Sequence, residues 1–263
     1  MHKMLKIHPN AIVSTKAKLG ENVSVGAFTI IEDDVVIGDN TEIRSSVVLA
    51  NGARIGKDCR IHSGAVIATE PQDLKFKNEP TLAVIGDRTV IREYVTINRG
   101  TTATGKAVVG SDCLIMAYAH VAHDCVLGDH IIMANSCQLA GHVELEDWVI
   151  LGGVAKVHQF CKVGAHAMIG ADVKLVKDVA PYLLVGTIPP KVDGINKIGL
   201  LRRGFSRDQI NEIVRFYDIV LHSGLNTGDG IEKYKSEYSG GVIPDYIQIS
   251  LDFINNSDRG IYR

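Results

Sequence analysis

Apolar residues recur every six positions along most of the chain up to Leu175. One series runs from Ile7 to Ile67, a shorter one from Ile85 to Ile97, and a third from Val109 to Leu175, which makes 26 six-residue units. An α-helix would repeat at about 3.6 residues and a flat strand at about 2, so a period of six predicts short strands joined by bends. Three such strands form a triangular coil, and stacked coils form a prism-shaped parallel β-helix.

The five cysteines share one phase of this period. Each occupies the fifth position of a unit counted from Ile7, four residues after an inward aliphatic residue. A redox or metal role would not require that common phase, whereas a small inward-facing slot would. The odd number also argues against a disulfide framework. We therefore expect all five to pack in the core; they are Cys59, Cys113, Cys125, Cys137 and Cys161.

Composition excludes several classes of protein. The chain is 46% hydrophobic and 22% charged, and its formal net charge of −2 lacks the basic excess of a nucleic-acid-binding protein. The sequence contains no run of apolar residues long enough to span a membrane, and residues 1–6 lack the apolar centre of a signal peptide. We expect a cytoplasmic protein without a membrane span.

Two interruptions of the period predict loops that project from the prism. The first covers about 68–84 and contains Pro71-Gln72-Asp73-Leu74-Lys75; the second covers about 98–108 and is rich in threonine and glycine. A rigid scaffold commonly carries binding residues on such loops. Tolerated insertion is the alternative for both, and for the second loop it is the favoured one.

The pattern changes after residue 180. Pro181, Pro189 and Pro190 indicate a linker, and a capping box at Ser206 then opens an amphipathic helix that ends near Gly224. A second helix is expected from Pro244 towards residue 256. The predicted domains are a β-helix over 1–180, followed by a linker and a small α-helical domain over 181–263 that could cover the open end of the prism.

The 18-residue coil brings chemical groups together at one corner. Subtraction places His123, Gly141 and Gln159 in one column, and Asp124, His142 and Phe160 in the next. A neutral histidine can take a proton from an alcohol, a carboxylate can hold its tautomer, and a backbone N–H beside the open notch of a glycine can stabilise an oxyanion. The column therefore suits acyl transfer.

Two other interpretations remain open from the residues alone. Histidine is the commonest zinc ligand, so His120 with His123 could belong to a metal site, although the phases of the two side chains diverge. Both could also be solvated residues on the outer face. His158 and the pair Arg202 and Arg203 are weaker candidates, since a structural bend and a solvated charge pair explain them equally well.

Several segments together resemble the acyl-ACP:UDP-N-acetylglucosamine O-acyltransferases, and the resemblance covers nearly the whole chain. They are the hexapeptide series, Pro71 to Lys75, Ile91-Arg92-Glu93, His120 to Cys125, Ala140-Gly141-His142-Val143, Val157-His158-Gln159-Phe160 and Leu201 to Ser206. The resemblance implies a mainly β fold, a left-handed parallel β-helix with a small C-terminal helical domain, although parallel crossovers are normally right-handed.

The same resemblance implies the reaction and the assembly. The expected enzyme is a homotrimer that needs no cofactor and no metal. It transfers a 3-hydroxyacyl group from acyl carrier protein to the 3-hydroxyl of UDP-N-acetylglucosamine, the first step of lipid A biosynthesis. His123 would be the general base, Asp124 would orient it, and the Gly141 amide would form the oxyanion hole.

Further residues match positions that contact substrates in this family. The matching set is Asp73, Lys75, His120, His142, Gln159, Asn196, Arg202 and Arg203. His158, beside Gln159, is kept as a further substrate-binding candidate. Ala171 matches a position that helps to set acyl length and is glycine in long-chain members. One methylene changes discrimination by only about 1–3 kcal/mol, so the chain length of the donor stays open.

The chain departs from the family pattern at two places. Asn98 stands where other members have histidine, and Ile198 stands where some have glutamate.

Three other functions compete with this O-acyltransferase activity, and the closest is N-acylation of a UDP-3-amino sugar. A γ-class carbonic anhydrase-like metalloenzyme is more distant, and a structural or ice-binding β-helix is disfavoured because no face carries a regular threonine array.

Overall fold

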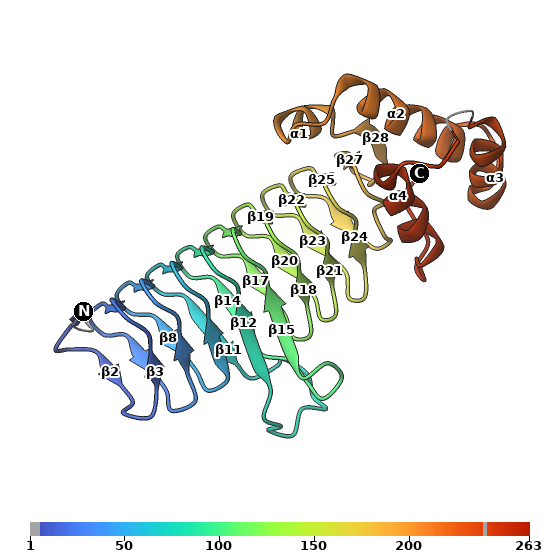
Figure 1. Cartoon of the computed structure of the whole chain (residues 1–263). Coiled ribbons are helices and arrows are strands. Elements are labelled where there is room, and N and C mark those ends of the chain that lie inside the picture. Colours follow the sequence, from blue (N-terminus) through green and yellow to red (C-terminus); the bar gives the residue numbers. More distant parts are fainter. Residues whose placement is uncertain (1–5, 239–240) are drawn as a thin grey trace.

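The computed structural model describes residues 6–238 and 241–263, so residues 1–5 of the expected first domain lie outside the described residues. Short strands stack into the three faces of a long prism, with the helices gathered at its C-terminal end (Figure 1). The parallel β-helix of hexapeptide repeats is confirmed. In the described part of the chain, no helix is both long and apolar enough to cross a bilayer.

Each face of the prism is one sheet. The first sheet contains β1 (Lys6–Ile7), β4 (Ser24–Val25), β7 (Glu42–Ile43), β10 (Arg60–Ile61), β13 (Val90–Ile91), β16 (Leu114–Ile115), β19 (Ile132–Met133), β22 (Ile150–Leu151), β25 (Met168–Ile169), β27 (Leu183–Val185) and β28 (Val192–Ile195). The second contains β2 (Ile12–Val13), β5 (Ile30–Ile31), β8 (Val48–Leu49), β11 (Val66–Thr69), β14 (Thr96–Asn98), β17 (His120–Val121), β20 (Gln138–Leu139), β23 (Lys156–Val157) and β26 (Lys174–Leu175). The third contains β3 (Lys18–Leu19), β6 (Val36–Ile37), β9 (Ala53–Ile55), β12 (Leu82–Ile85), β15 (Lys106–Val109), β18 (Val126–Leu127), β21 (Glu144–Leu145) and β24 (Lys162–Val163).

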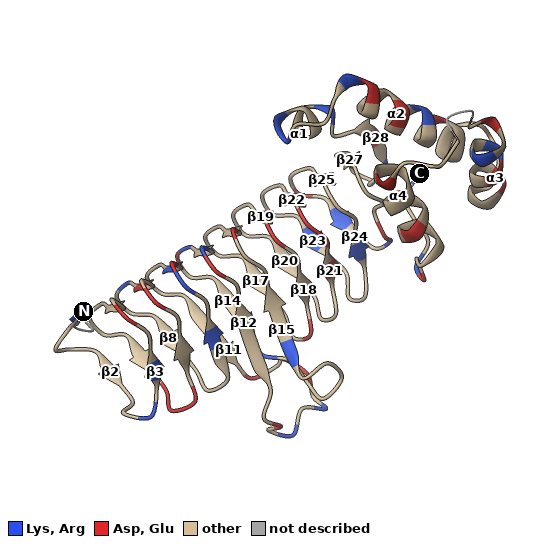
Figure 2. Ribbon diagram, viewed as in Figure 1, with Lys and Arg blue, Asp and Glu red and all other residues tan. Residues whose placement is uncertain are grey.

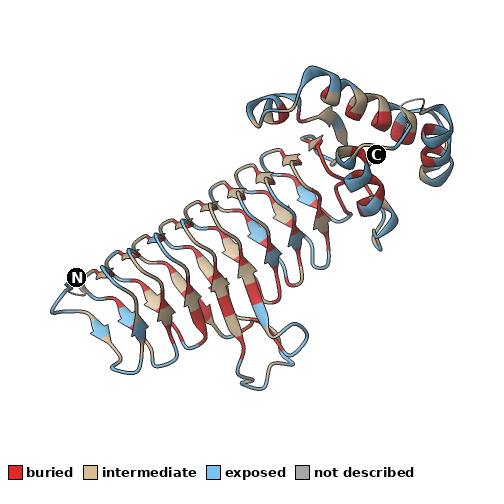
Figure 3. Ribbon diagram, in the orientation of Figure 1, coloured by how far each residue is buried: buried red, intermediate tan, exposed pale blue. Residues whose placement is uncertain are grey.

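The register between coils follows the predicted subtraction. In the second sheet, His120 pairs with Gln138, and Gln138 pairs with Lys156, each 18 residues further along the chain. From Val25 onward, the aliphatic first positions of the units point inward and are buried together with the small fifth positions (Figure 3). The core is therefore a continuous column inside the prism.

The cysteines lie in this column, as predicted. All five are buried and free. The Cys125 thiol donates to the carbonyl of Ala140 at 3.1 Å, and burial raises the pKa of Cys125 to about 12. The Cys137 thiol donates to the carbonyl of Gly152 at 3.0 Å. These thiols fill space and satisfy carbonyls, and their raised pKa values disfavour redox chemistry.

The two interruptions leave the prism as loops. Residues 70–81 connect β11 to β12, and residues 99–105 connect β14 to β15. Both loops emerge at the same level of the prism (Figure 1). Both loops begin where the pairing of β11 with β14 is irregular. There Thr69, and not Ala68, pairs with Asn98.

The segment that we expected to be a linker is partly sheet. β27 pairs with β25 in parallel, and β28 then pairs with β27 in antiparallel fashion. The prism's first sheet thus continues past Pro181. The prolines misled the prediction because they flank the strands rather than interrupt them.

The C-terminal part contains α1 (Lys197–Arg202), α2 (Arg207–His222), α3 (Thr227–Glu237) and α4 (Asp245–Asn255). The capping box of Ser206 and Gln209 opens α2 as predicted. Pro244 caps α4 and is not its first helical residue. The prediction missed α1, which is short, and α3, which contains glycine at two positions and has little apolar periodicity.

The helices cover the end of the prism. The Tyr217 hydroxyl donates to the carbonyl of Pro181 at 2.8 Å, and the buried Asp178 accepts from the Ser257 hydroxyl at 2.7 Å and the Lys162 N–H at 2.8 Å. Tyr182 and Leu183 are fully enclosed.

Replacement of Cys137 by leucine should destabilise the prism. Its slot already has no solvent access, and extra methyl groups in a packed core cost about 1–3 kcal/mol. Guanidinium unfolding followed by circular dichroism should show a lower midpoint for Cys137→Leu, while Lys18→Leu on the outer face should unfold close to the wild type. Equal midpoints for both variants would contradict the inward slot.

Candidate active site

His123 and Asp124 lie at a corner of the prism, directly after β17. Asp124 has a left-handed backbone with φ of 59°, and its carboxylate is 2.7 Å from Nδ1 of His123. The side chain of Asp124 is fully buried, and that of His123 is 14% exposed. An ionised carboxylate accepts, so Nδ1 carries the proton and Nε2 is left able to take one.

The second loop binds the same carboxylate. Asp124 accepts hydrogen bonds from the Thr101 N–H at 2.9 Å, the Thr101 hydroxyl at 2.8 Å and the Thr104 hydroxyl. Burial alone would raise the pKa of Asp124. The hydrogen bonds from Thr104, His123 and Thr101 outweigh that effect and lower the pKa to about 2. Asp124 therefore remains ionised at neutral pH.

Sequence reasoning missed Thr101 and Thr104. It favoured tolerated insertion for their loop, and the loop breaks the period by which neighbours are found. The only signal was the density of threonine itself, which is common in loops of no function.

Gly141 lies one coil above His123, as the period predicted. The His142 N–H donates to the His123 carbonyl at 3.1 Å, which fixes the two coils in register. A Cβ at Gly141 would lie 2.6 Å from Cε1 and 2.7 Å from Nε2 of His123, so only glycine leaves room for the ring. In the described part of the chain the Gly141 N–H donates no hydrogen bond.

His142 forms the far wall of the corner. Its Nε2 is 3.7 Å from the Asp124 carboxylate, and its ring stacks on Phe160 with centroids 4.5 Å apart. The predicted neighbours Asp124, His142 and Phe160 therefore do form one column.

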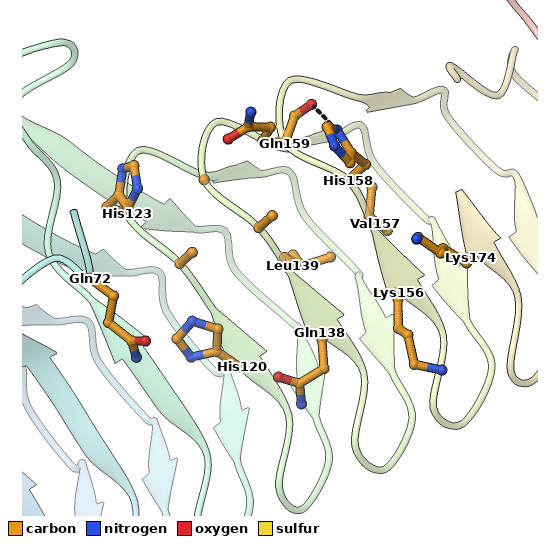
Figure 4. Close-up of a pocket in the computed structure, with 13 residues that line it drawn as sticks. Gln72, His120, His123, Gln138, Leu139, Lys156, Val157, His158, Gln159 and Lys174 are labelled. Carbon is orange, nitrogen blue, oxygen red and sulfur yellow. Dashed lines mark hydrogen bonds between the residues drawn. The ribbon is translucent and has the colours of Figure 1, made fainter. Parts of the chain in front are cut away.

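Two grooves meet at His123. The first has a volume of about 510 Å³ and runs along the second sheet (Figure 4). It is lined by Gln72, His120, Ala122, His123, Gln138, Leu139, Ala140, Gly141, Lys156, Val157, His158, Gln159 and Lys174. The second has a volume of about 530 Å³ and is lined by Gln72, Asp73, Leu74, Lys75, His123, His142, Gln159 and Phe160. Gln72, His123 and Gln159 belong to both.

His120 and His158 line the first groove in fixed orientations. Nδ1 of His120 is 2.7 Å from the Thr96 hydroxyl, and burial together with neighbouring His123 lowers the pKa of His120, so the ring is neutral at pH 7. Nδ1 of His158 donates to the Gln159 carbonyl at 3.1 Å. In Figure 4, His120, His123 and Gln72 surround one end of the groove.

The comparisons with known proteins agree over the full length. The family model "Udp N-acetylglucosamine O-acyltransferase; Domain 2" matches residues 178–262, and the bacterial transferase hexapeptide model matches 34–69 and 106–141. Proteins named acyl-[acyl-carrier-protein]–UDP-N-acetylglucosamine O-acyltransferase from Herminiimonas arsenicoxydans and Janthinobacterium sp. (strain Marseille) are 45% and 46% identical. In each case the match covers 99% of this chain and 100% of the relative. The chain belongs to this acyltransferase family.

Solved structures of the family have the same fold. The UDP-N-acetylglucosamine acyltransferase of Bacteroides fragilis is 44% identical with a TM-score of 0.95, and the match covers 97% of this chain and 99% of that one. The enzyme of Francisella novicida is 38% identical with a TM-score of 0.93, with 98% and 94% covered. The left-handed β-helix with a small helical part is thus confirmed.

Four residues that the resemblance singled out lie away from both grooves of this family member. Asn196 caps α1 by accepting from the Gly199 N–H, and its amide donates to the His166 carbonyl. Arg202 is exposed at the end of α1, and Ala171 lies exposed in the turn before β26. Arg203, the fourth, contacts an aromatic stack on another corner.

That stack holds the Arg203 guanidinium. The guanidinium lies 5.1 Å from the Trp148 ring and donates to Nδ1 of His166 at 3.2 Å. Burial and, secondly, the positive charge of Arg203 lower the pKa of His166 to about 4. His166 is therefore neutral and accepts the hydrogen bond from Arg203. Figure 4 shows no residue of the helical part among those that line the groove.

The structure also shows where the two residues that depart from the family pattern lie. Asn98 is buried, and its amide donates to the Thr69 hydroxyl at 3.1 Å and the Glu70 carbonyl at 3.0 Å, where the first loop begins. Ile198 is 66% exposed on α1. Asn98 therefore secures the base of the loop that carries Asp73 and Lys75.

The donor set of the corner fits acid–base chemistry better than a metal. Ligand atoms of His123, Asp124 and His142 lie within 4.8 Å of one another, at the corner where the period places them. However, the Asp124 carboxylate already accepts from His123, Thr101 and Thr104. A cation would have to displace those donors, so the residues present do not fit a metal.

Substitution of Gly141 by alanine should displace the His123 ring. The added Cβ would approach ring atoms far closer than van der Waals contact, so the ring or the coil must move. Turnover should fall by at least tenfold while the circular dichroism spectrum stays unchanged. Gly153→Ala is the matched control and should keep most of its activity, because a Cβ there would come no closer than 3.7 Å to another residue and lies outside both grooves. Normal turnover of Gly141→Ala would contradict the stacking.

Removal of the Thr104 hydroxyl should destabilise the protein in a pH-dependent way. A lost hydrogen bond to a carboxylate costs about 1.5–3 kcal/mol, but only while Asp124 is ionised. Because the folded-state pKa of Asp124 is depressed, the stability that it contributes is present above about pH 4 and is lost as the pH falls towards 2.

The free energy of unfolding, measured by urea titration, checks this dependence. Thr104→Val should differ from the wild type fully at pH 7 and much less at pH 2.5, whereas Thr104→Ser should resemble the wild type. The exposed neighbour Thr102 provides the control Thr102→Val. A pH-independent loss would assign Thr104 to packing alone.

Proposed function

We propose that this chain transfers a 3-hydroxyacyl group from acyl carrier protein to the 3-hydroxyl of UDP-N-acetylglucosamine, the first step of lipid A biosynthesis, in the cytoplasm. The carrying observation is the hydrogen-bonded pair of His123 and Asp124 beside the Gly141 notch, in a chain that matches named O-acyltransferases over its full length. The proposed reaction needs no cofactor.

The proposed mechanism assigns one task to each group. Nε2 of His123 takes the proton of the 3-hydroxyl while its oxygen attacks the thioester carbonyl carbon. Asp124 keeps the proton on Nδ1 and balances the imidazolium that forms. The Gly141 N–H stabilises the oxyanion of the tetrahedral intermediate. Collapse breaks the carbon–sulfur bond, and the imidazolium returns its proton to the thiolate.

The two grooves suggest how the substrates share the site. Asp73, Lys75 and His142 line the second groove with several donors and acceptors, which suits the hydroxyls of a sugar. His120, His158 and Gln159 line the first groove beside apolar Ala122 and Ala140, which suits the acyl donor.

A homotrimer would complete the site. Asn196, Arg202, Arg203 and Ala171 lie outside both grooves, so they could approach a substrate bound at His123 only from an adjacent prism. In that assembly the arginines would contact the nucleotide or the acidic carrier protein, and Ala171 would limit the acyl chain.

Substitution of His123 by alanine tests the proposed base. Turnover with 3-hydroxyacyl carrier protein and UDP-N-acetylglucosamine should fall by about two to four orders of magnitude. Light scattering should report a trimer for both the variant and the wild type. Near-normal turnover of His123→Ala would contradict the mechanism, and a monomeric wild type would contradict the assembly.

Mass spectrometry of the product distinguishes the acceptors. A mixed pool of acyl carrier proteins, offered with the 3-hydroxy and 3-amino UDP-sugars, should yield an O-acylated product of one preferred chain length. Exclusive acylation of the amino sugar would replace the proposed function by N-acylation.

A further inference from the structure

Two lysines close the far end of the first groove. Lys156 and Lys174 project from β23 and β26 on the same side as His120 and Gln138 (Figure 4). Lys156 pairs with Gln138 on one side and with Lys174 on the other, so the four residues form a single outward row. The row therefore runs from His120, close to His123, to the two lysines at the far end of the groove.

The charge of this end is not balanced within the chain. Like charges directly opposite one another on neighbouring strands repel, and such a pair needs compensation. Lys156 forms an ion pair with Asp172 at 2.8 Å, and over residues 6–238 and 241–263 Lys174 makes no ion pair. The remaining groove residues carry no charged carboxylate or guanidinium group. Figure 2 shows basic residues on these last coils.

We infer that Lys156 and Lys174 bind a phosphate-ester anion of a substrate whose reacting end lies at His123. This inference rests on the proposed function, because both proposed substrates carry such a group. UDP-N-acetylglucosamine has a diphosphate, and acyl carrier protein is joined to its pantetheine arm by a phosphodiester.

The distance along the row favours the carrier's phosphodiester. Lys156 is two strand spacings and Lys174 three spacings from His120, which corresponds to about 10 and 14 Å. The diphosphate of the nucleotide sugar is attached to the ring that carries the reacting hydroxyl. The phosphodiester, in contrast, is separated from the thioester by the whole pantetheine arm.

The floor between the two ends suits such an arm. Ala140 supplies exposed apolar surface, and Gln138 and His158 offer polar groups beside it. An extended chain with amide groups can therefore lie along the row, with its thioester at His123 and its phosphate at the lysines.

The test compares two small donors that differ only in the phosphate. The 3-hydroxyacyl thioesters of phosphopantetheine and of pantetheine are each assayed with UDP-N-acetylglucosamine. The variants are Lys156→Gln, Lys174→Gln and the double variant, with Lys18→Gln on the third sheet as the charge-matched control. The ratio of kcat/KM for the phosphopantetheine thioester to that for the pantetheine thioester should fall about three- to tenfold for each lysine replaced. Added salt should reduce this effect.

The outcomes separate the sources of the anion. A lower ratio with an unchanged KM for UDP-N-acetylglucosamine supports the carrier's phosphodiester. A raised KM for the nucleotide sugar with an unchanged ratio supports a phosphate-ester site that binds the diphosphate. If neither quantity changes, the lysines are solvated surface groups and the inference is overturned. The wild type assayed with 3-hydroxyacyl carrier protein is the positive control, and its failure to turn over that donor would overturn the proposed function instead.

Discussion

Hydrogen bonds between successive coils hold each residue beside the one eighteen positions later, wherever no loop intervenes. The bond from the His142 N–H to the His123 carbonyl is one rung of that ladder, and the bond from the Phe160 N–H to the Gly141 carbonyl is the next. Every contact at the corner depends on this register. A slip of one coil would put a side chain other than Gly141 against the His123 ring.

The corners impose a backbone that most residues avoid. Asp124, His142 and Phe160 have φ of 59°, 61° and 62°, in the left-handed region that usually favours glycine. Such a conformation costs of order 1 kcal/mol or more for each residue, and the ladder on both sides stabilises it. As a result, successive corner side chains stack outward in a rigid column, as the rings of His142 and Phe160 do.

The regular part of the molecule could be predicted from the sequence because its neighbours follow from counting. The period predicted the prism, the buried cysteines and the contact of Gly141 with His123. It could not predict Thr101 and Thr104, which reach Asp124 from a loop that interrupts the count. It also missed β27 and β28, where prolines suggested a linker, and the stacking of Arg203 on Trp148, which joins segments with no common period.

The hydrogen bonds of Asp124 decide which group at the corner can take a proton. Its carboxylate is buried and accepts from His123, Thr101 and Thr104, so protonation would break bonds without a gain in solvation. The pKa of about 2 expresses this preference for the ionised form. The charged carboxylate beside Nδ1 of His123 keeps the proton on that nitrogen. Nε2 is therefore the basic atom of the His123 ring, and it faces the notch at Gly141. In the proposed mechanism the second loop thus acts through Asp124, because it keeps the carboxylate charged and in place while His123 exchanges the proton.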